Sequence, residues 1–78
     1  MSLAAQLPAR DPVLLGRALK ALRQRRGLSQ AELAASLGFH RSYLSQLERG
    51  GMNEQVMRLF DLLRALDGEL AVIDRSSQ

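Results

Sequence analysis

The sequence contains no cysteine and no tryptophan, and it has one histidine, one tyrosine and two phenylalanines. Without cysteine, the chain has no disulfides, no cysteine-ligated zinc and no thiol catalysis. The single histidine, His40, has Ser42 and Ser45 nearby but no carboxylate arranged as a catalytic triad requires. No Gly-rich phosphate loop or metal-ligand spacing is present either. The sequence therefore predicts neither an enzyme nor a cofactor or metal site.

Long hydrophobic runs are also missing. The longest apolar runs, such as 13–15 and 70–73, are far too short to cross a bilayer. Residues 1–8 lack the basic start and long apolar stretch of a secretory signal. We therefore expect a soluble protein in a reducing compartment, which favours the cytoplasm.

Charge is distributed unevenly along the 78 residues, although the formal net charge is only +3. In the first third of the chain only Asp11 opposes a run of basic residues: Arg10, Arg17, Lys20, Arg23, Arg25 and Arg26. Such a run is typical of a protein that binds a polyanion. Composition alone favours a solvated helix face, which is the usual reason for such a run, and leaves the polyanion-binding interpretation open.

Residues 29–50 contain the clearest motif, SQAELAASLGFHRSYLSQLERG. Ser29 followed by Glu32 predicts a capping box at a helix start. Gly38 predicts the left-handed residue that ends this helix, and the small Ala34 would let another helix approach closely. A second helix is predicted from near His40 to Gly50. Two short helices joined by a turn with glycine form a helix-turn-helix, whose second helix enters the DNA major groove.

Helices are also predicted on both sides of the motif. One begins at Asp11 and Pro12 and ends at Gly27, and another begins with Asn53 as N-cap and ends at Gly68. The second of these has an apolar stripe that we expect to be core: Val56, Leu59, Phe60, Leu63 and Leu66. We therefore expect a flexible N-terminal tail over 1–10, a DNA-binding domain over 11–68 and a C-terminal tail over 75–78.

Residues 69–74, ELAVID, favour a strand. An isolated strand leaves its backbone groups unpaired, and no second strand is evident in the sequence. We therefore expect this segment to be a dimerisation strand that pairs antiparallel with its copy in a homodimer. Its central residues would be Leu70, Ala71, Val72 and Ile73. The alternatives are a frayed tail or a continuation of the preceding helix.

The motif resembles the Cro/repressor type (XRE family) of helix-turn-helix. The resemblance rests on Ala34, Gly38, Leu44 and the Leu-Glu-Arg-Gly ending at 47–50. It implies an all-α, lambda-repressor-like domain of four to five helices, with the C-terminal strand pairing across a homodimer. In that family an arginine at the position of Arg23 pairs with a glutamate at the position of Glu48, which implies a structural salt bridge.

The C-terminal strand narrows the resemblance to the HipB-like antitoxins. Those proteins are homodimers that bind operator DNA upstream of their own genes and hold a HipA-type kinase toxin. The resemblance implies a transcriptional repressor, with an autoregulatory antitoxin of a toxin-antitoxin pair as the finer expectation, in the cytoplasm and associated with the nucleoid. A solitary regulator shares the same helices. A protein-interaction module and an RNA-binding module are further alternatives, although RNA recognition usually needs more aromatic residues.

DNA contacts are expected on the side of the second motif helix that faces away from Leu44 and Leu47. The expected base contacts are His40, Arg41, Ser42, Ser45 and Gln46. Arg41 is the strongest candidate, because a guanidinium can bind both O6 and N7 of guanine. The expected phosphate contacts lie at the start of the first motif helix and along the second: Ser29, Gln30, Tyr43 and Arg49.

Overall fold

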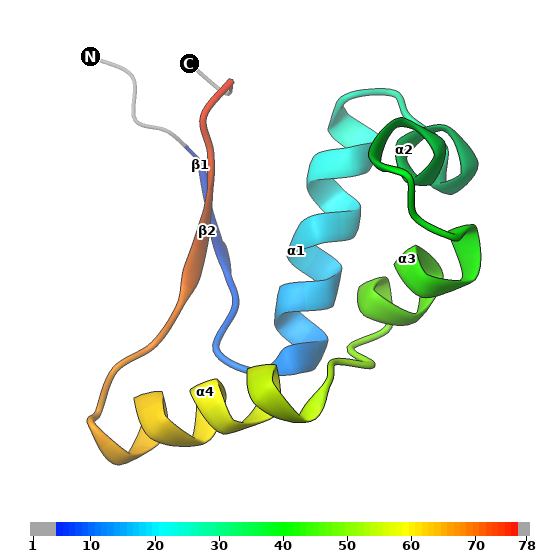
Figure 1. Cartoon of the computed structure of the whole chain (residues 1–78). Coiled ribbons are helices and arrows are strands. Elements are labelled where there is room, and N and C mark those ends of the chain that lie inside the picture. The colour runs from blue at the N-terminus through cyan, green and yellow to red at the C-terminus, as the bar shows by residue number, and fades with distance from the viewer. Residues whose placement is uncertain (1–4, 77–78) are drawn as a thin grey trace.

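The computed structural model describes residues 5–76 and contains four helices and two strands (Figure 1). In chain order these elements are β1 (Ala5–Pro8), α1 (Pro12–Arg25), α2 (Gln30–Leu37), α3 (Arg41–Glu48), α4 (Glu54–Ala65) and β2 (Ala71–Asp74). The predicted helical domain with a C-terminal strand is thus confirmed. None of the helices within 5–76 is long and apolar enough to cross a membrane.

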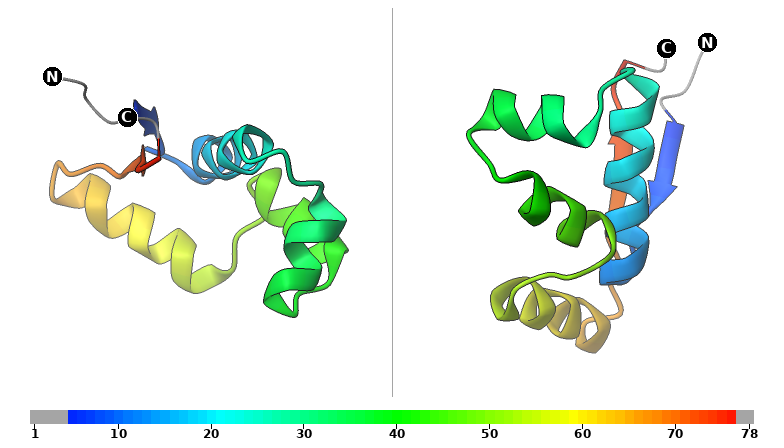
Figure 2. Two further views of the ribbon diagram at one scale, coloured as in Figure 1. Left: turned by 90° about the horizontal axis from the view of Figure 1, so that it is seen from above. Right: turned by 90° about the vertical axis from the view of Figure 1, so that its right-hand side faces the viewer.

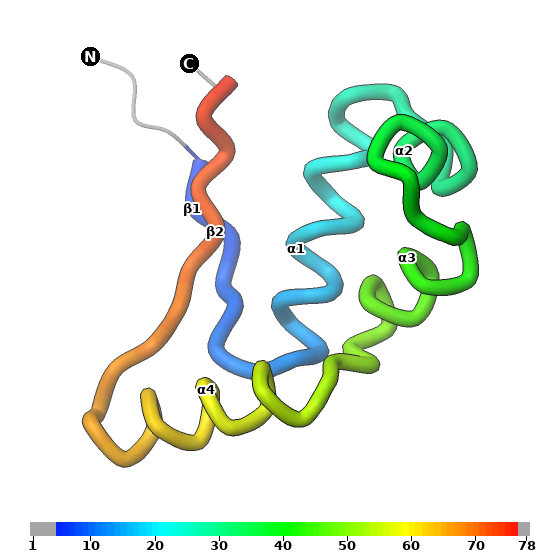
Figure 3. Tube along the Cα trace, viewed as in Figure 1, coloured from blue at the N-terminus to red at the C-terminus, as the bar shows by residue number. Residues whose placement is uncertain are grey.

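Helix α1 is the central element of the domain. The two strands lie along one side of it and α2 and α3 lie on the other, as Figures 1 and 3 show. The helix begins where expected: Asp11 Oδ1 accepts a hydrogen bond from the Leu14 N–H at 2.8 Å, and Pro12 occupies the first turn. Proline fits there because its missing N–H would have no partner in that turn.

Local capping signals also mark both ends of α2 and the start of α4. Ser29 Oγ accepts from the Glu32 N–H at 3.0 Å, and Glu32 Oε1 accepts from the Ser29 N–H at 2.8 Å, which is the predicted capping box. Gly38 has a φ of 72°, a left-handed conformation that glycine adopts without strain. Asn53 caps α4 through the Val56 N–H at 3.0 Å. Helix α4 ends at Ala65, slightly before the expected Gly68, and Asp67 takes a positive φ of 58°.

The strand β2 pairs antiparallel with β1 of the same chain, with Leu7 opposite Val72 (Figure 3). This corrects the expectation that residues 1–10 form a flexible tail and that no second strand exists. The reason is that Ala5 and Leu7 turn towards the molecule while Gln6 and Pro8 are exposed, so this short edge strand has one face to bury. Residues 1–4 and 77–78 of the expected tails lie outside the described residues.

The buried core is small. Its apolar members are Ala9, Ala18, Ala34, Leu44 and Phe60, three of which are alanines. Helices α1 and α3 pack very closely, because a Cβ added to Gly16 would lie 2.5 Å from the Leu47 carbonyl oxygen. Glycine is required at this contact, since backbone atoms of α3 occupy the place of a side chain.

The apolar stripe of α4 is only partly core, which corrects the sequence prediction. Phe60 is 2% exposed, whereas Leu59 and Leu66 are 46% and 71% exposed. The apolar residues of α4 occupy more of the helix circumference than the core of this chain can cover. Val56, Phe60 and Leu63 turn towards the chain, while Leu59 and Leu66 lie further around the helix and face outwards.

Candidate nucleic-acid interface

Helix α3 divides into a buried face and an exposed polar face. Leu44 is 6% exposed and anchors the helix to the core. Arg41, Ser42 and Gln46 are exposed, so three of the predicted base-contacting side chains reach solvent from one short helix. Helices α2 and α3 are in contact and follow each other through the turn at Gly38 (Figure 2). An exposed polar second helix in this arrangement has the geometry of a major-groove reader.

The first turn of α3 lacks a capping side chain. His40 is the N-cap residue, and its side chain makes no capping hydrogen bond. Histidine is a poor N-cap compared with serine, threonine, aspartate or asparagine. The exposed His40 ring therefore stays available beside the N–H groups at the start of α3, where the helix dipole favours an anion.

Three other predicted DNA contacts already interact with neighbouring side chains: Ser45, Arg49 and Tyr43. Ser45 is only partly exposed, and its hydroxyl accepts a hydrogen bond from Arg49 Nη1 at 3.1 Å. Tyr43 is 49% exposed and meets Phe39 edge to face, with ring centroids 5.4 Å apart. Phe39 is itself 44% exposed, so this aromatic pair lies on the surface beside the polar face of α3.

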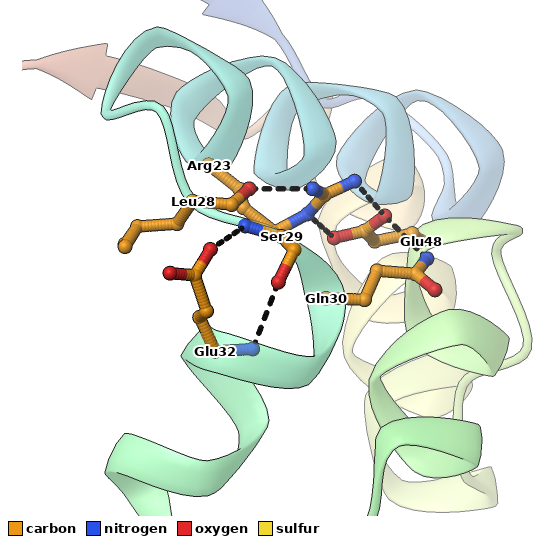
Figure 4. Close-up of polar contacts among 6 residues, drawn as sticks. All are labelled: Arg23, Leu28, Ser29, Gln30, Glu32 and Glu48. Carbon is orange, nitrogen blue, oxygen red and sulfur yellow. Dashed lines mark hydrogen bonds and ion pairs between the residues drawn. The ribbon is translucent and has the colours of Figure 1, made fainter.

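The residues Arg23, Glu48, Gln30 and Leu28 join the first three helices through one hydrogen-bond network (Figure 4). Arg23 on α1 binds Glu48 at the end of α3 twice, with Nε to Oε2 at 2.6 Å and Nη2 to Oε1 at 3.0 Å. Its Nη1 donates to the Leu28 carbonyl oxygen at 2.8 Å. Such a planar, two-point contact fixes orientation as well as distance. Arg23 thus holds the position of α3 rather than extending towards solvent.

Burial makes this ion pair strongly coupled. The Arg23 and Glu48 side chains are 9% and 3% exposed. The hydrogen bonds from Arg23 hold the pKa of the Glu48 carboxyl below its usual range. The same bonds raise the pKa of the Arg23 guanidinium. Both groups are therefore charged at neutral pH, and each charge compensates the other.

The start of α2 has two polar side chains, Ser29 and Gln30, which make different hydrogen bonds within the protein. Gln30 Nε2 donates to Glu48 Oε1 at 3.0 Å, so one donor of the predicted phosphate contact is already used within the protein. The Ser29 hydroxyl accepts a hydrogen bond in the capping box, and its own O–H remains able to donate. Both residues lie at a helix N-terminus, where backbone N–H groups suit a phosphate.

Part of the basic run near the end of α1 is used internally, which the sequence analysis missed. Arg25 and Arg26 both form ion pairs with Asp74, whose side chain is 1% exposed. These contacts attach the end of β2 to the end of α1. The sequence signal was the acidic Asp74 closing an apolar strand, but its partners could be found only in three dimensions. Within residues 5–76, no group of histidine and acidic side chains is arranged to hold a metal ion.

Comparison with known protein families agrees with this geometry. Residues 19–73 match HTH_3, a helix-turn-helix family. The chain belongs to this family. The match includes all of α2 and α3 with their turn, and it extends through α4 into β2.

Several curated proteins are similar to this chain. An uncharacterized HTH-type transcriptional regulator, y4dJ, from Sinorhizobium fredii is 45% identical over 53 residues, which is 68% of this chain and 69% of that protein. A second regulator from the same organism, y4dL, is 43% identical over 54 residues, but the match covers only 28% of its length. The antitoxin HipB of Escherichia coli K12 is 30% identical over 64 residues, 82% of this chain and 73% of HipB. No solved structure matches the chain significantly.

These relatives place the helix-turn-helix of this chain among DNA-binding transcriptional regulators. This is a class of binding proteins rather than of enzymes. The family match over residues 19–73 includes α3 and its exposed polar face.

Proposed function

We propose that this protein is a transcriptional repressor that reads a specific operator with α3 and acts as a homodimer. The observation that supports it best is the combination of an exposed polar face on α3 with the buried Arg23 to Glu48 pair that orients the helix. A helix can read bases only if its position is fixed to within a small fraction of a base-pair step. The network in Figure 4 ties α3 to α1 and α2 and so supports a fixed position for α3.

Sequence discrimination is assigned to the exposed residues His40, Arg41, Ser42 and Gln46, with a lesser role for Ser45, which is partly covered. Arg41 in the first turn would bind guanine O6 and N7, a contact that contributes about 1 to 3 kcal/mol of discrimination. Affinity without sequence information is assigned to phosphate contacts: Ser29, Gln30, Tyr43 and Arg49.

The experiment is a binding titration with fluorescent duplexes of the region upstream of the gene and of the same region scrambled. We expect the native duplex to bind more tightly, and Arg41→Ala to remove most of this preference. Arg64→Ala is the matched control, because it removes the same charge from α4, where Arg64 pairs with the exposed Asp61. Equal binding of wild type to both duplexes would exclude a sequence-specific repressor and favour the protein-interaction alternative.

Salt dependence separates the two alternatives further. If the protein contacts several phosphates, the affinity for DNA should fall steeply between about 50 and 200 mM salt, because binding releases condensed counterions. Arg49→Ala should weaken binding to both duplexes by similar factors and make this slope shallower, because it removes a cationic phosphate contact. Ser29→Ala should also weaken binding to both duplexes but leave the slope unchanged, because a neutral hydroxyl displaces no counterion. A protein-interaction module has no such slope on DNA.

A finer proposal is that the repressor is the antitoxin of a toxin-antitoxin pair and controls its own gene. It is supported by the similarity to the antitoxin HipB, at 30% identity over 64 residues. The implied partner is a HipA-type kinase, and the implied location is the cytoplasm, bound to the nucleoid. The test is co-expression with such a kinase from the same genome. Rescue of growth by this chain, together with a stable complex, would support the antitoxin role. Growth arrest that persists would leave a solitary regulator.

A further inference from the structure

The outer side of α4 has an apolar surface that this chain does not cover. Leu59, Leu62 and Leu66 are 46%, 55% and 71% exposed. Their spacing of three and four residues places them in one stripe along the helix. Together with Gln55 and Arg58 they border a shallow groove that also reaches Val56. In Figures 1 and 2, α4 crosses the base of the molecule, and no other described element lies beyond it.

This stripe is separate from the side of α4 that serves the core. Phe60, at 2% exposed, points into the molecule, and Val56 and Leu63 lie on the same side. The charged side chains occupy a third side, where Glu54 pairs with Arg58 and Asp61 pairs with Arg64. The charged side of α4 is therefore solvated, and the side with Phe60 packs against the core. The leucine stripe packs against nothing else within residues 5–76.

The accessible surface area and the radius of gyration of the chain are both larger than those of a compact monomer of this mass. The chain exposes 5759 Å², whereas a folded monomer of 8.6 kDa exposes about 4,700 Å². The excess, about 1,000 Å², is summed over the whole surface and is not confined to α4, and it is large enough to include the roughly 800 Å² that each partner buries in a standard interface. The radius of gyration of 13.5 Å also exceeds the about 11.5 Å typical of a compact domain of this length.

We infer that a second copy of this chain covers the leucine stripe, so that α4 packs against α4 of the partner across a two-fold axis. A symmetric contact suits this surface, because the three leucines can meet their copies without opposing like charges, while Arg58 lies at the border of the groove and pairs with Glu54. The inference rests on the proposed homodimer and specifies its interface. It places the contact on α4 instead of on the strand β2, which is already paired with β1 along one edge.

The absence of cysteine makes this arrangement directly testable by disulfide trapping. Single cysteines are introduced as Leu59→Cys, Leu62→Cys and Leu66→Cys, and Asp61→Cys on the charged side is the matched control. Helices packed face to face lie 8 to 10 Å apart, so Cβ atoms near the axis come within disulfide range. We expect at least one stripe variant to form a covalent dimer under mild oxidation at micromolar concentration, and the control to remain largely uncrosslinked.

Solution mass provides the second measurement, and it uses the full chain. Wild type should have the mass of a dimer, and Leu62→Glu should shift it towards a monomer while retaining helical circular dichroism. A monomeric wild type would overturn the inference. A dimeric wild type in which Leu62→Glu stays dimeric and the stripe cysteines crosslink no better than Asp61→Cys would also overturn it and move the interface elsewhere, for instance to the free edge of β2.

These outcomes differ from failure of the proposed function. If wild type is a dimer that crosslinks through α4 but binds native and scrambled duplexes equally, the interface stands and the operator-specific repressor does not. If wild type prefers the native duplex but is monomeric, the repressor stands and the α4 interface does not.

Discussion

Arg23 is the residue on which the position of α3 most directly depends. We expect Arg23→Ala to lower the free energy of unfolding by about 3 kcal/mol, because it leaves Glu48 buried without a compensating charge. It also removes a donor from the Leu28 carbonyl oxygen. Urea denaturation measures the effect. The control is Arg58→Ala, whose ion pair with Glu54 has side chains 76% and 78% exposed and should contribute no more than about 0.5 kcal/mol.

The result also decides the role of Arg23 in binding. A positioning residue should lower stability and DNA affinity together. If Arg23→Ala weakened DNA binding while leaving the denaturation midpoint unchanged, Arg23 would be a DNA contact and the assignment as a structural residue would fail. The double variant Arg23→Met with Glu48→Met removes both charges, and it should recover part of the lost stability.

Asp74 gives the stability a dependence on acid pH. Hydrogen bonds from Arg26 and then Arg25 lower the pKa of the Asp74 carboxyl far below its ordinary range. A lowered folded-state pKa stabilises the fold fully above the unfolded value, about 4, and this stabilisation is lost as pH falls through the folded value. Glu48, whose pKa is lowered by Arg23, acts in the same direction.

We therefore expect the melting temperature of Asp74→Asn to lie below that of wild type at pH 7, and the two to approach each other as pH falls below about 4. Thermal melts across this range measure the difference. Asp61→Asn is the control, because its pair with Arg64 is exposed and should contribute little at any pH. A difference that stayed constant from pH 7 to strongly acid conditions would show that Asp74 acts by shape and not by charge.

Among the four helices that the structure describes within residues 5–76, α3 alone begins without a side-chain cap. We expect His40→Ser to stabilise the protein by about 1 kcal/mol, which for a domain of this size raises the melting temperature by about 4 to 8 °C. Ser29→Ala, which removes the cap of α2, should change it by a similar amount in the opposite direction. An unchanged or lower melting temperature in His40→Ser would mean that the imidazole makes contacts a hydroxyl cannot replace.

The variant His40→Ser also tests the role of His40 in DNA recognition. If His40 contacts DNA, as we propose, His40→Ser should bind the operator less selectively even though it is more stable. Stability and discrimination would then change in opposite directions, which is the pattern expected where a residue is chosen for function at a structural cost.

Helix boundaries were predictable from sequence because their determinants are local. Ser29 with Glu32, Asn53, and Asp11 with Pro12 each act within three residues, and the structure contains every one of these starts. The partners of β2 were not predictable in this way. Pro8 and its neighbours have little strand preference of their own, and β1 forms because β2, more than sixty residues away in the chain, offers a paired edge.

In the candidate site, too, features with local determinants were predictable and contacts between distant elements were not. The exposed residues of α3 followed from helical periodicity, since whatever faces away from Leu44 must face solvent. The use of Gln30 by Glu48 and of Arg25 and Arg26 by Asp74 did not, because these contacts join different elements. Periodicity also could not say that only half of the apolar surface of α4 meets the chain's own core, since both halves have the same composition.

For the whole molecule, a homodimer would join two features that are otherwise unrelated. A core whose apolar residues are mostly alanine contributes little stability, and one short recognition helix reads few base pairs. A two-fold axis covers the leucine stripe of α4 and presents two copies of α3 to DNA. Dimers of this motif bind half-sites about 34 to 36 Å apart, so the operator should be an inverted repeat with half-sites one helical turn or a multiple of it apart.

If folding and association are coupled in this way, stability must depend on protein concentration. Unfolding that separates two chains shifts by about 2.7 kcal/mol per dimer for a hundredfold change in concentration, so the melting temperature of wild type should rise by several degrees. Leu62→Glu should melt lower and show no such rise, because a monomer unfolds without a change in the number of particles. A wild-type melting temperature independent of concentration would mean that the alanine-rich core suffices for stability, and the exposed leucines of α4 would then need a partner other than a second copy.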